Sequence, residues 1–242
     1  MKLNFEQLEV AVKDAYLLDP EEFTNIRRQG IGASDSSVIL GLQKQWKTTE
    51  DIIEEKLRTH VTEEEKEIGR KISVRKGRDL EPLILDKASE FFKEKIIKPT
   101  DMYRLKHIPY LTVNFDGVMK YNTEYPIPVE AKFVTTYGEK YYNVDNAIKN
   151  KRDKDLKYQL EIKNSFIDQD VEVKAKAVGI PPYYYAQVQQ QLLALDAPYG
   201  YLVALHDKTW ELSVHLVPAD PMVQFEIIRK GKEVWDEIEA RR

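Results

Sequence analysis

The segment Phe115-Asp116-Gly117 is followed by Pro128-Val129-Glu130-Ala131-Lys132, and these two stretches indicate both the fold and the chemistry of the chain. The first contains a common turn dipeptide, Asp116-Gly117, and the second lies in a β-rich run over residues 127–135. If Asp116 lies at a hairpin turn and Glu130 on the next strand, their carboxylates can meet at one point. Two such oxygen ligands are what Mg²⁺ prefers.

The second segment also predicts how its side chains are directed. Positions i and i+2 of a strand share a face, so Glu130 and Lys132 should point the same way while Ala131 points into the core. The small Ala131 leaves its backbone carbonyl available as a third oxygen ligand. An ammonium group beside a metal can orient an attacking water or offset charge on a phosphorus transition state. Taken alone, Asp116-Gly117 also fits an ordinary turn, and Glu130-Ala131-Lys132 a solvated strand face.

The rest of the chain predicts helices around a central sheet. Apolar spacing, proline and glycine positions favour helices over residues 5–18, 20–30, 77–95, 181–195 and 221–239, and a further helix that Ser34 or Asp35 caps and that runs through Leu40. β-rich runs favour strands over residues 111–115, 118–121, 127–135, 200–205 and 209–217. The polar, lysine-rich residues 143–157 are expected to form an exposed loop. We therefore predict an α/β or α+β fold with a central mixed sheet of about five strands flanked by helices.

The charge balance limits the class of protein. The 37 Lys and Arg residues are nearly matched by 41 Asp and Glu residues, giving a formal net charge of −4. This excludes a protein that coats nucleic acid through overall basicity, as histones do. It leaves open a nucleic-acid enzyme, because a binding channel needs only local positive charge and a metal site adds its own carboxylates.

The absence of cysteine excludes disulfides, thiolate nucleophiles and cysteine-bound zinc or iron–sulfur clusters. Any metal must then be held by oxygen or histidine ligands. No run of about 18 apolar residues is present and the N-terminus lacks a signal-peptide core, so we expect a cytoplasmic protein that does not enter a membrane. No repeat or Pro/Gly/Ser-rich linker divides the sequence, which favours a single domain over residues 1–242.

Three further segments accompany the two stretches first described. Residues 27–35 have the sequence RRQGIGASD, residues 77–81 have GRDLE, and residues 184–189 have YYAQVQ. With Asp116 and Glu130-Ala131-Lys132 they resemble, in the same order, the motifs of the PD-(D/E)xK nuclease superfamily. The closer resemblance is to the phage lambda exonuclease and YqaJ-type viral recombinase nucleases. It covers residues 27–189 and implies a restriction-endonuclease-like core.

This resemblance implies an acidic metal centre with a lysine beside it. Its implied members are the side chains of Glu81, Asp116, Glu130, Lys132 and Gln187 and the backbone carbonyl of Ala131. Glu81 would complete the acidic cluster directly, through water or by holding a second metal. Gln187 would help to fix Lys132 or the nucleophilic water, although the run of glutamines around it also fits a polar helix face. The implied cofactor is Mg²⁺, for which Mn²⁺ is expected to substitute.

The glycine-rich segment implies a phosphate pocket. Arg27 aligns with the family's arginine that grips a terminal 5′-phosphate, and Ser34 with the serine that assists it. Arg28 is a second candidate, less well placed because the family arginine precedes the serine by seven residues, as Arg27 does. A guanidinium beside a hydroxyl and helix-terminal N–H groups binds phosphate well on physical grounds alone. Both arginines also fit the role of cations that close a helix.

The implied reaction is Mg²⁺-dependent hydrolysis of linear duplex DNA in the 5′-to-3′ direction from 5′-phosphate ends. It leaves a 3′ overhang that a single-strand annealing protein would use in recombination. Family members of this type form trimeric rings around the duplex, and the positive charge of the channel would come from residues 70–78 and the lysines near 149–157. Two alternatives remain: an endonuclease or other end-processing nuclease of the same superfamily, and a catalytically inactive protein that binds DNA ends.

Overall fold

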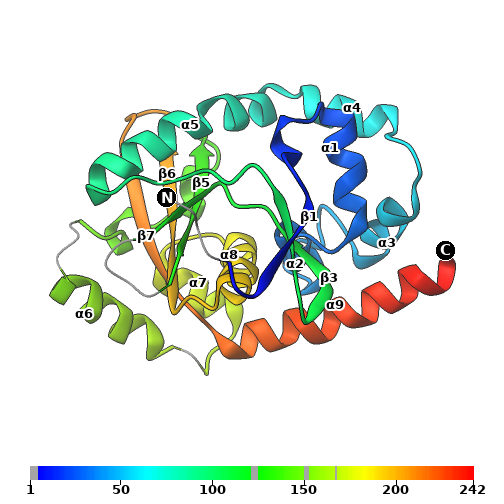
Figure 1. The fold of residues 1–242 in the computed structure, drawn as a ribbon. Coiled ribbons are helices and arrows are strands. Elements are labelled where there is room, and N and C mark those ends of the chain that lie inside the picture. Colours follow the sequence, from blue (N-terminus) through cyan, green and yellow to red (C-terminus); the bar gives the residue numbers. More distant parts are fainter. Residues whose placement is uncertain (1–4, 121–124, 150–152, 167) are drawn as a thin grey trace.

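The fold contains two small β-sheets, as the computed structural model of residues 5–120, 125–149, 153–166 and 168–242 shows (Figure 1). The first sheet is antiparallel and has the order β1-β2-β3, with strands Leu8–Val12, Met102–Leu105 and Ile108–Val113. The second has the order β4-β5-β6-β7, with strands Gly117–Met119, Ile127–Val134, Tyr199–His206 and Leu212–Pro218. Its central pair, β5 and β6, is parallel, whereas β4 and β7 run antiparallel to their neighbours.

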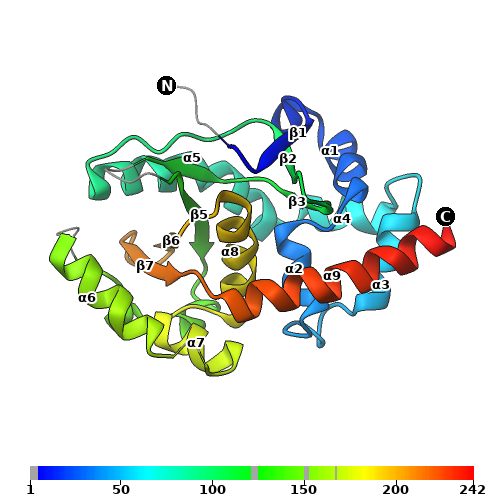
Figure 2. The ribbon, with the colours of Figure 1, turned by 60° about the horizontal axis from the view of Figure 1, so that its bottom comes forward.

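Helices surround both sheets. In chain order, the α-helices are α1 (Pro20–Ile26), α2 (Ala33–Ile39), α3 (Thr49–Leu57), α4 (Glu63–Arg70), α5 (Ile72–Phe92), α6 (Asp153–Asn164), α7 (Val171–Val178), α8 (Pro182–Leu195) and α9 (Pro221–Arg241). Short 3₁₀ turns occur at Ala15–Leu17, Arg27–Gln29, Glu139–Tyr141 and Val144–Asn146. Figure 2 shows α8 between the four-stranded sheet and α2, with α9 running along the same side toward the C-terminus.

The alternation of side chains along β5 assigns its two faces to different helices. Val129 and Ala131 lie in one core cluster with Ile84 and Leu85 of α5. Glu130, between them, points to the other face, where α8 lies. This is the arrangement that a period of two residues predicts for a strand.

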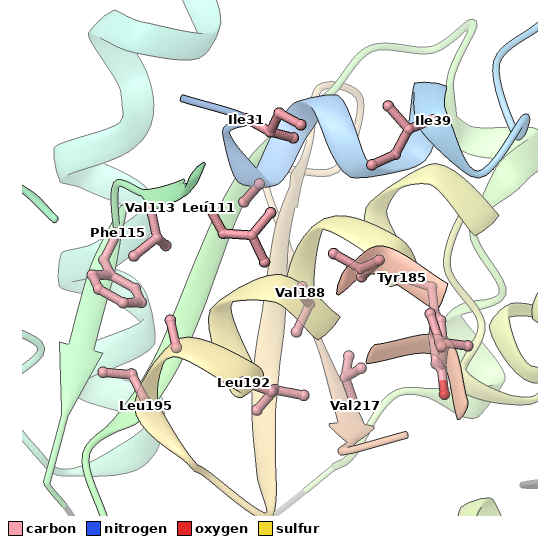
Figure 3. Close-up of a cluster of buried hydrophobic side chains, with 14 of the residues drawn as sticks. Ile31, Ile39, Leu111, Val113, Phe115, Tyr185, Val188, Leu192, Leu195 and Val217 are labelled. Atoms are coloured by element: carbon pink, nitrogen blue, oxygen red, sulfur yellow. The ribbon is translucent and has the colours of Figure 1, made fainter. Parts of the chain in front are cut away.

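Helix α8 joins the two sheets through a second core cluster. Its residues Val188 and Leu192 are fully buried together with Leu111 of β3 and Ile31, which precedes α2 (Figure 3). A backbone bridge between Ile31 and Leu111 attaches the start of α2 to the edge of β3. The packing therefore fixes α2, β3 and α8 relative to one another, which positions the site described below.

The predicted fold class is confirmed, with differences in detail. The strands that we expected in one central sheet belong to two sheets, because the chain leaves β3 at Val113 and enters a different sheet at Gly117. Asp116 is accordingly not at a hairpin turn, as we predicted, but on the connection between the sheets. The strands β4 and β5 pair antiparallel, and residues 121–124 between them, which include the end of the predicted strand over residues 118–121, lie outside the described part.

The predicted helix over residues 5–18 is wrong. Residues Leu8–Val12 form β1, which pairs with β2, and the Phe5 ring packs against Tyr103 with centroids 5.0 Å apart. This tertiary pairing outweighs the weak local preference for a helix. The predicted loop over residues 143–157 is also partly wrong, since α6 begins at Asp153.

The other predicted helices are present, with α5 beginning earlier than expected, at Ile72. Within the described part of the chain, no helix is both long enough and apolar enough to cross a membrane. The single domain over residues 1–242 stays a prediction.

Candidate active site

Asp116 and Glu130 meet where the two sheets join. Gly117 of β4 is paired with Val129 of β5, and the two strands are antiparallel. Asp116, which directly precedes Gly117, therefore lies opposite Glu130, which directly follows Val129. The Asp116 Oδ2 atom accepts a hydrogen bond of 3.0 Å from the backbone N–H of Ala131. Because the N–H and C=O of a strand residue point to the same edge, the carbonyl of Ala131 is directed to the side on which Asp116 lies.

Gly117 makes this approach possible. A Cβ atom at position 117 would lie 2.4 Å from Cγ2 of Ile96 and 2.9 Å from Cδ2 of Leu85. These contacts are shorter than van der Waals distance, so any larger residue would displace the start of β4. Asp116 directly precedes this point, and its position therefore depends on the close packing of Gly117 beneath α5.

Glu130 is fully buried and surrounded by donors. Its Oε1 atom contacts Lys132 Nζ and Gln187 Nε2, and its Oε2 atom accepts a hydrogen bond of 2.6 Å from Gln191 Nε2. Lys132 Nζ also lies 3.8 Å from Asp116 Oδ2. The structure thus brings together Asp116, Glu130, Lys132 and Gln187, with Gln187 on the glutamate rather than on the lysine.

The charges in this group shift one another's pKa values. Burial, and then the nearby charge of Asp116, raise the pKa of Glu130 to about 7. Burial alone would lower the pKa of Lys132, but the Glu130 and Asp116 carboxylates outweigh it and raise that pKa. Lys132 therefore carries a positive charge at neutral pH, and two carboxylates that repel each other lie beside it.

Glu81 lies at the edge of this group. It comes from α5, and its Oε1 atom forms an ion pair with Lys98 Nζ. Burial and the charge of Asp116 raise its pKa. Lys98 Nζ also lies 4.3 Å from the centre of the Tyr16 ring. The charge of Asp116 thus affects Glu81, while the Glu81 carboxylate is paired with Lys98.

The donor set fits a hard divalent cation. Asp116, Glu130 and the Ala131 carbonyl offer oxygen ligands of the kind that Mg²⁺ binds. Burial, and then the charge of Asp116, raise the pKa of Glu130, and a bound cation would favour its charged form again. Across the described ranges, however, no three acidic or histidine side chains lie close enough together to form a complete metal centre on their own. A cation here would need the backbone carbonyl, waters or a DNA phosphate as further ligands.

A pocket of about 160 Å³ connects this group to the predicted phosphate site. Arg27 and Ser34 line it on one side and Asp116 and Gln187 on the other. Arg27 Nη2 donates a hydrogen bond of 2.8 Å to Ser34 Oγ. The two residues that the resemblance assigned to a 5′-phosphate are therefore in contact with each other and share a pocket with Asp116.

Arg28 does not lie in this pocket. Its guanidinium is buried, donates to both carboxylate oxygens of Glu65 at 3.0 and 3.1 Å and donates to Asn25 Oδ1 at 2.7 Å. Through these contacts the Arg28 side chain holds α4 against α1. We therefore leave Arg28 out of the proposed phosphate pocket.

Three buried polar side chains, those of Lys56, Asp35 and Gln190, hold the segment that carries Arg27 and Ser34. Lys56 Nζ donates 2.9 Å to the backbone oxygen of Arg27 and lies 2.7 Å from Asp35 Oδ2. Asp35 in turn accepts 2.9 Å from the N–H of Gly32 at the start of α2. Gln190 of α8 donates to the backbone oxygens of Ile31 and Thr112. The side-chain amide of Gln190 thus joins this segment to β3.

Sequence reasoning missed several of these residues. Gln191 follows Gln187 by about one helical turn, and this spacing could have identified it as a second hydrogen-bond donor to Glu130. Lys56, Lys98 and Tyr16 have no local signal, because each reaches the site from a distant part of the sequence. The Ser34 hydroxyl does not cap α2, because the helix begins with Gly32 as its cap residue and the Asp35 side chain makes the capping contact.

A family model for the YqaJ-like viral recombinase domain matches residues 22–197, well over half of the chain. The chain belongs to this family. The match includes Arg27, Glu81, Asp116, Lys132 and Gln187. All the motifs described above, over residues 27–189, lie within the matched range.

Solved structures show the same fold. A crystal structure of an alkaline exonuclease, LHK-Exo, from Laribacter hongkongensis has a TM-score of 0.59 and 14% identity and covers 89% of this YqaJ-like chain and 90% of its own. The structure of LHK-Exo in complex with dAMP gives a TM-score of 0.56 and 13% identity, over 91% and 93% of the two chains. A search of curated proteins gave no match.

Proposed function

We propose that this YqaJ-like protein is a Mg²⁺-dependent exonuclease that hydrolyses linear duplex DNA from 5′-phosphate ends in the 5′-to-3′ direction and leaves a 3′ overhang. The observation that supports it best is the single pocket that Arg27 and Ser34 share with Asp116 and Gln187. A guanidinium and a hydroxyl that can hold a terminal phosphate lie beside carboxylates that can hold a cation. The relation of fold to an alkaline exonuclease supports the same reaction class.

Each residue has a role in this proposal. Arg27 and Ser34 bind the terminal phosphate, and Asp116, Glu130 and the Ala131 carbonyl hold Mg²⁺ or Mn²⁺. When bound, the cation supplies Lewis-acid chemistry at the scissile phosphate. Lys132 keeps its proton at neutral pH and so orients the attacking water and offsets charge on the phosphate oxygens.

Gln187 and Gln191 are positioning residues. Both donate to Glu130, one to each carboxylate oxygen, and so fix the plane of that carboxylate. Glu81 contributes negative charge beside Asp116 and is released from Lys98 if it binds the cation directly. The ion pair with Lys98 then determines how readily Glu81 binds the cation.

The proposal extends to assembly and partners. Exposed cations of α4 and the first turns of α5, including Arg70, Arg75 and Arg78, line a cleft of about 820 Å³ beside α1. In a trimeric ring, these side chains would supply the positive charge that an acidic chain needs to hold duplex DNA. A single-strand annealing protein would take up the 3′ overhang in the cytoplasm. Size measurement in solution tests the ring, and a monomer would contradict it.

One assay tests the activity. The purified chain is incubated with Mg²⁺ and linear duplex carrying either 5′-phosphate or 5′-hydroxyl ends, alongside covalently closed circles. We expect loss of the 5′-phosphorylated linear duplex first and no loss of the circles. Cutting of closed circles would show an endonuclease, and binding without any cleavage would show an inactive end-binding protein.

The phosphate pocket is tested in the same assay. Arg27→Ala should remove the preference for 5′-phosphate ends while leaving slow cleavage of 5′-hydroxyl ends. Arg229→Ala is a matched control, because that arginine is exposed on α9 and pairs only with neighbouring glutamates among the described residues. If Arg27→Ala kept the full preference, the proposed pocket would be wrong.

A further inference from the structure

A row of aromatic side chains leads from Lys132 to the protein surface. The Lys132 Nζ atom lies 5.0 Å from the centre of the Tyr184 ring, and the Tyr184 and Tyr183 rings meet edge-on with centroids 4.5 Å apart. Tyr183 in turn meets Trp46 edge-on at 5.8 Å. We call Tyr184, Tyr183 and Trp46 the aromatic row. It begins at the candidate active site and ends at an indole that is 61% exposed.

A second group of rings lies in the segment that follows β5, the strand that carries Lys132. Lys140 Nζ lies 4.9 Å from the ring centres of both Tyr137 and Tyr141, and Tyr137 is 80% exposed. Lys140 and Tyr141 lie in the 3₁₀ turn Glu139–Tyr141 of this segment. The exposed rings are therefore accompanied by cations.

The exposure of these rings is costly without a ligand. A tryptophan at the surface leaves a large apolar face in water. Trp46 lies in the segment between α2 and α3, and the exposed Lys44 precedes it by two residues. The acid nearest in sequence to Lys140 is Glu139, whose carboxylate pairs with Lys208 at 3.1 Å. Exposed aromatic rings and cations thus occur both at the outer end of the aromatic row and in the segment that follows β5.

We propose that the aromatic row binds unpaired DNA by base stacking on Trp46 and Tyr183, an inference that rests on the proposed function. Every base has a π face that can stack on an aromatic ring, while lysines attract the phosphates. Within a duplex every base pair except the terminal ones is stacked on both faces, so a row of several rings fits an unpaired strand. A strand separated at the site would pass along the row, and the row would bind it without sequence preference.

Binding without cleavage tests this proposal directly. The intact protein is titrated, in EDTA, into a fluorescently labelled oligothymidylate with a 5′-hydroxyl end, and anisotropy is recorded. Trp46→Ala should weaken binding by about tenfold, the order expected for one lost base stack. Trp46→Phe should keep most of the affinity. Trp210→Ala is the matched control, because Trp210 is 50% exposed and lies in the turn between β6 and β7.

A second ligand separates stacking from charge. The same strand with abasic sites in place of thymidines keeps its phosphates, and we expect the original protein and Trp46→Ala to bind it equally. Equal affinity of both proteins for oligothymidylate, or an equal loss with the abasic strand, would overturn the proposal. A protein that cleaves DNA but binds independently of Trp46 would contradict only this inference. Trp46-dependent binding by a protein that never cleaves would contradict only the proposed nuclease.

Discussion

Lys56 Nζ lies 2.7 Å from Asp35 Oδ2, and both side chains are almost completely shielded from solvent beneath the segment that presents Arg27 and Ser34. The lysine also donates to the backbone oxygen of Arg27, and the aspartate accepts from Gly32. The pair therefore ties the two ends of the glycine-rich segment together. Neither residue reaches the pocket itself, so the pair positions the groups that would hold a phosphate.

Replacing Lys56 by methionine should destabilise the protein strongly. The change leaves the Asp35 carboxylate buried without its cation, which costs about 3–5 kcal/mol in free energy of unfolding. Urea unfolding measures this loss. Lys232→Met is the matched control, because Lys232 pairs with Asp236 on the exposed face of α9 and should change the stability by less than about 1 kcal/mol. Equal losses in the two variants would contradict the role of the buried pair.

The same aspartate predicts a pH dependence of stability. Burial alone would raise the pKa of Asp35, but the charges of Lys56 and Arg27 lower it from 3.8 to about 2. A folded-state pKa below the unfolded value means that the stabilisation is complete above about pH 4 and is lost as the pH falls toward 2, by about 2 kcal/mol. Unfolding free energies measured across this range should show a steeper fall than those of Asp35→Asn.

Lys132→Met should abolish most activity while the chain stays folded. The lysine carries the only charge proposed to act on the attacking water, and loss of such a group lowers kcat by at least about 10²-fold. KM for duplex ends should change little, because Arg27 and Ser34 remain. Lys208→Met provides the control, since Lys208 is 59% exposed and pairs with Glu139. Activity of Lys132→Met near the original level would exclude the assigned site.

Divalent cations should stabilise the protein before any DNA is added. A ligand at about 100 times its Kd raises the free energy of unfolding by about 2.7 kcal/mol, which is a rise in Tm of several degrees. Thermal unfolding with EDTA, Mg²⁺ or Mn²⁺ measures it. Asp116→Asn should lose the shift, whereas Asp86→Asn, on an exposed position of α5, should keep it. A shift that survives in Asp116→Asn would place the cation elsewhere.

Gly117→Ala should destabilise the protein and lower its activity. The added methyl would meet Ile96 and Leu85 well inside contact distance, and such overpacking costs about 1–3 kcal/mol. Gly69→Ala in α4 is the contrasting variant, because a Cβ there meets nothing within 4 Å and alanine favours the helix. Calorimetry should therefore show opposite signs for the two changes. A neutral effect of Gly117→Ala would contradict the close packing at the sheet junction.

The local part of this site could be predicted from the sequence. The period of two residues in β5 correctly predicted that Glu130 and Lys132 share a face and that Ala131 packs into the core. The helices near residues 33–40 and 181–195 were likewise marked by glycine and proline at their starts. In each case the deciding interactions are between neighbours in the chain.

The remaining features depend on contacts between distant segments. Strand β1 forms because Leu8 pairs with Leu105, and nothing in residues 5–18 alone reveals that partner. Lys56 and Lys98 are ordinary surface residues in sequence terms and become part of the site only through tertiary packing. The division into two sheets is similarly set by the path of residues 114–116, which no periodicity describes.

The glutamines of α8 make the candidate site a product of complete folding. Gln187 and Gln191 hold Glu130, while Gln190 holds Ile31 and Thr112, across separations of up to 159 residues. A nascent chain that has emerged only as far as residue 180 already contains both carboxylates, the lysine and the arginine. It lacks the side-chain amides of Gln187 and Gln191, which hold Glu130, and that of Gln190. We expect such a ribosome-bound chain to be inert toward DNA, so that the candidate active site is assembled only once α8 is made and docked.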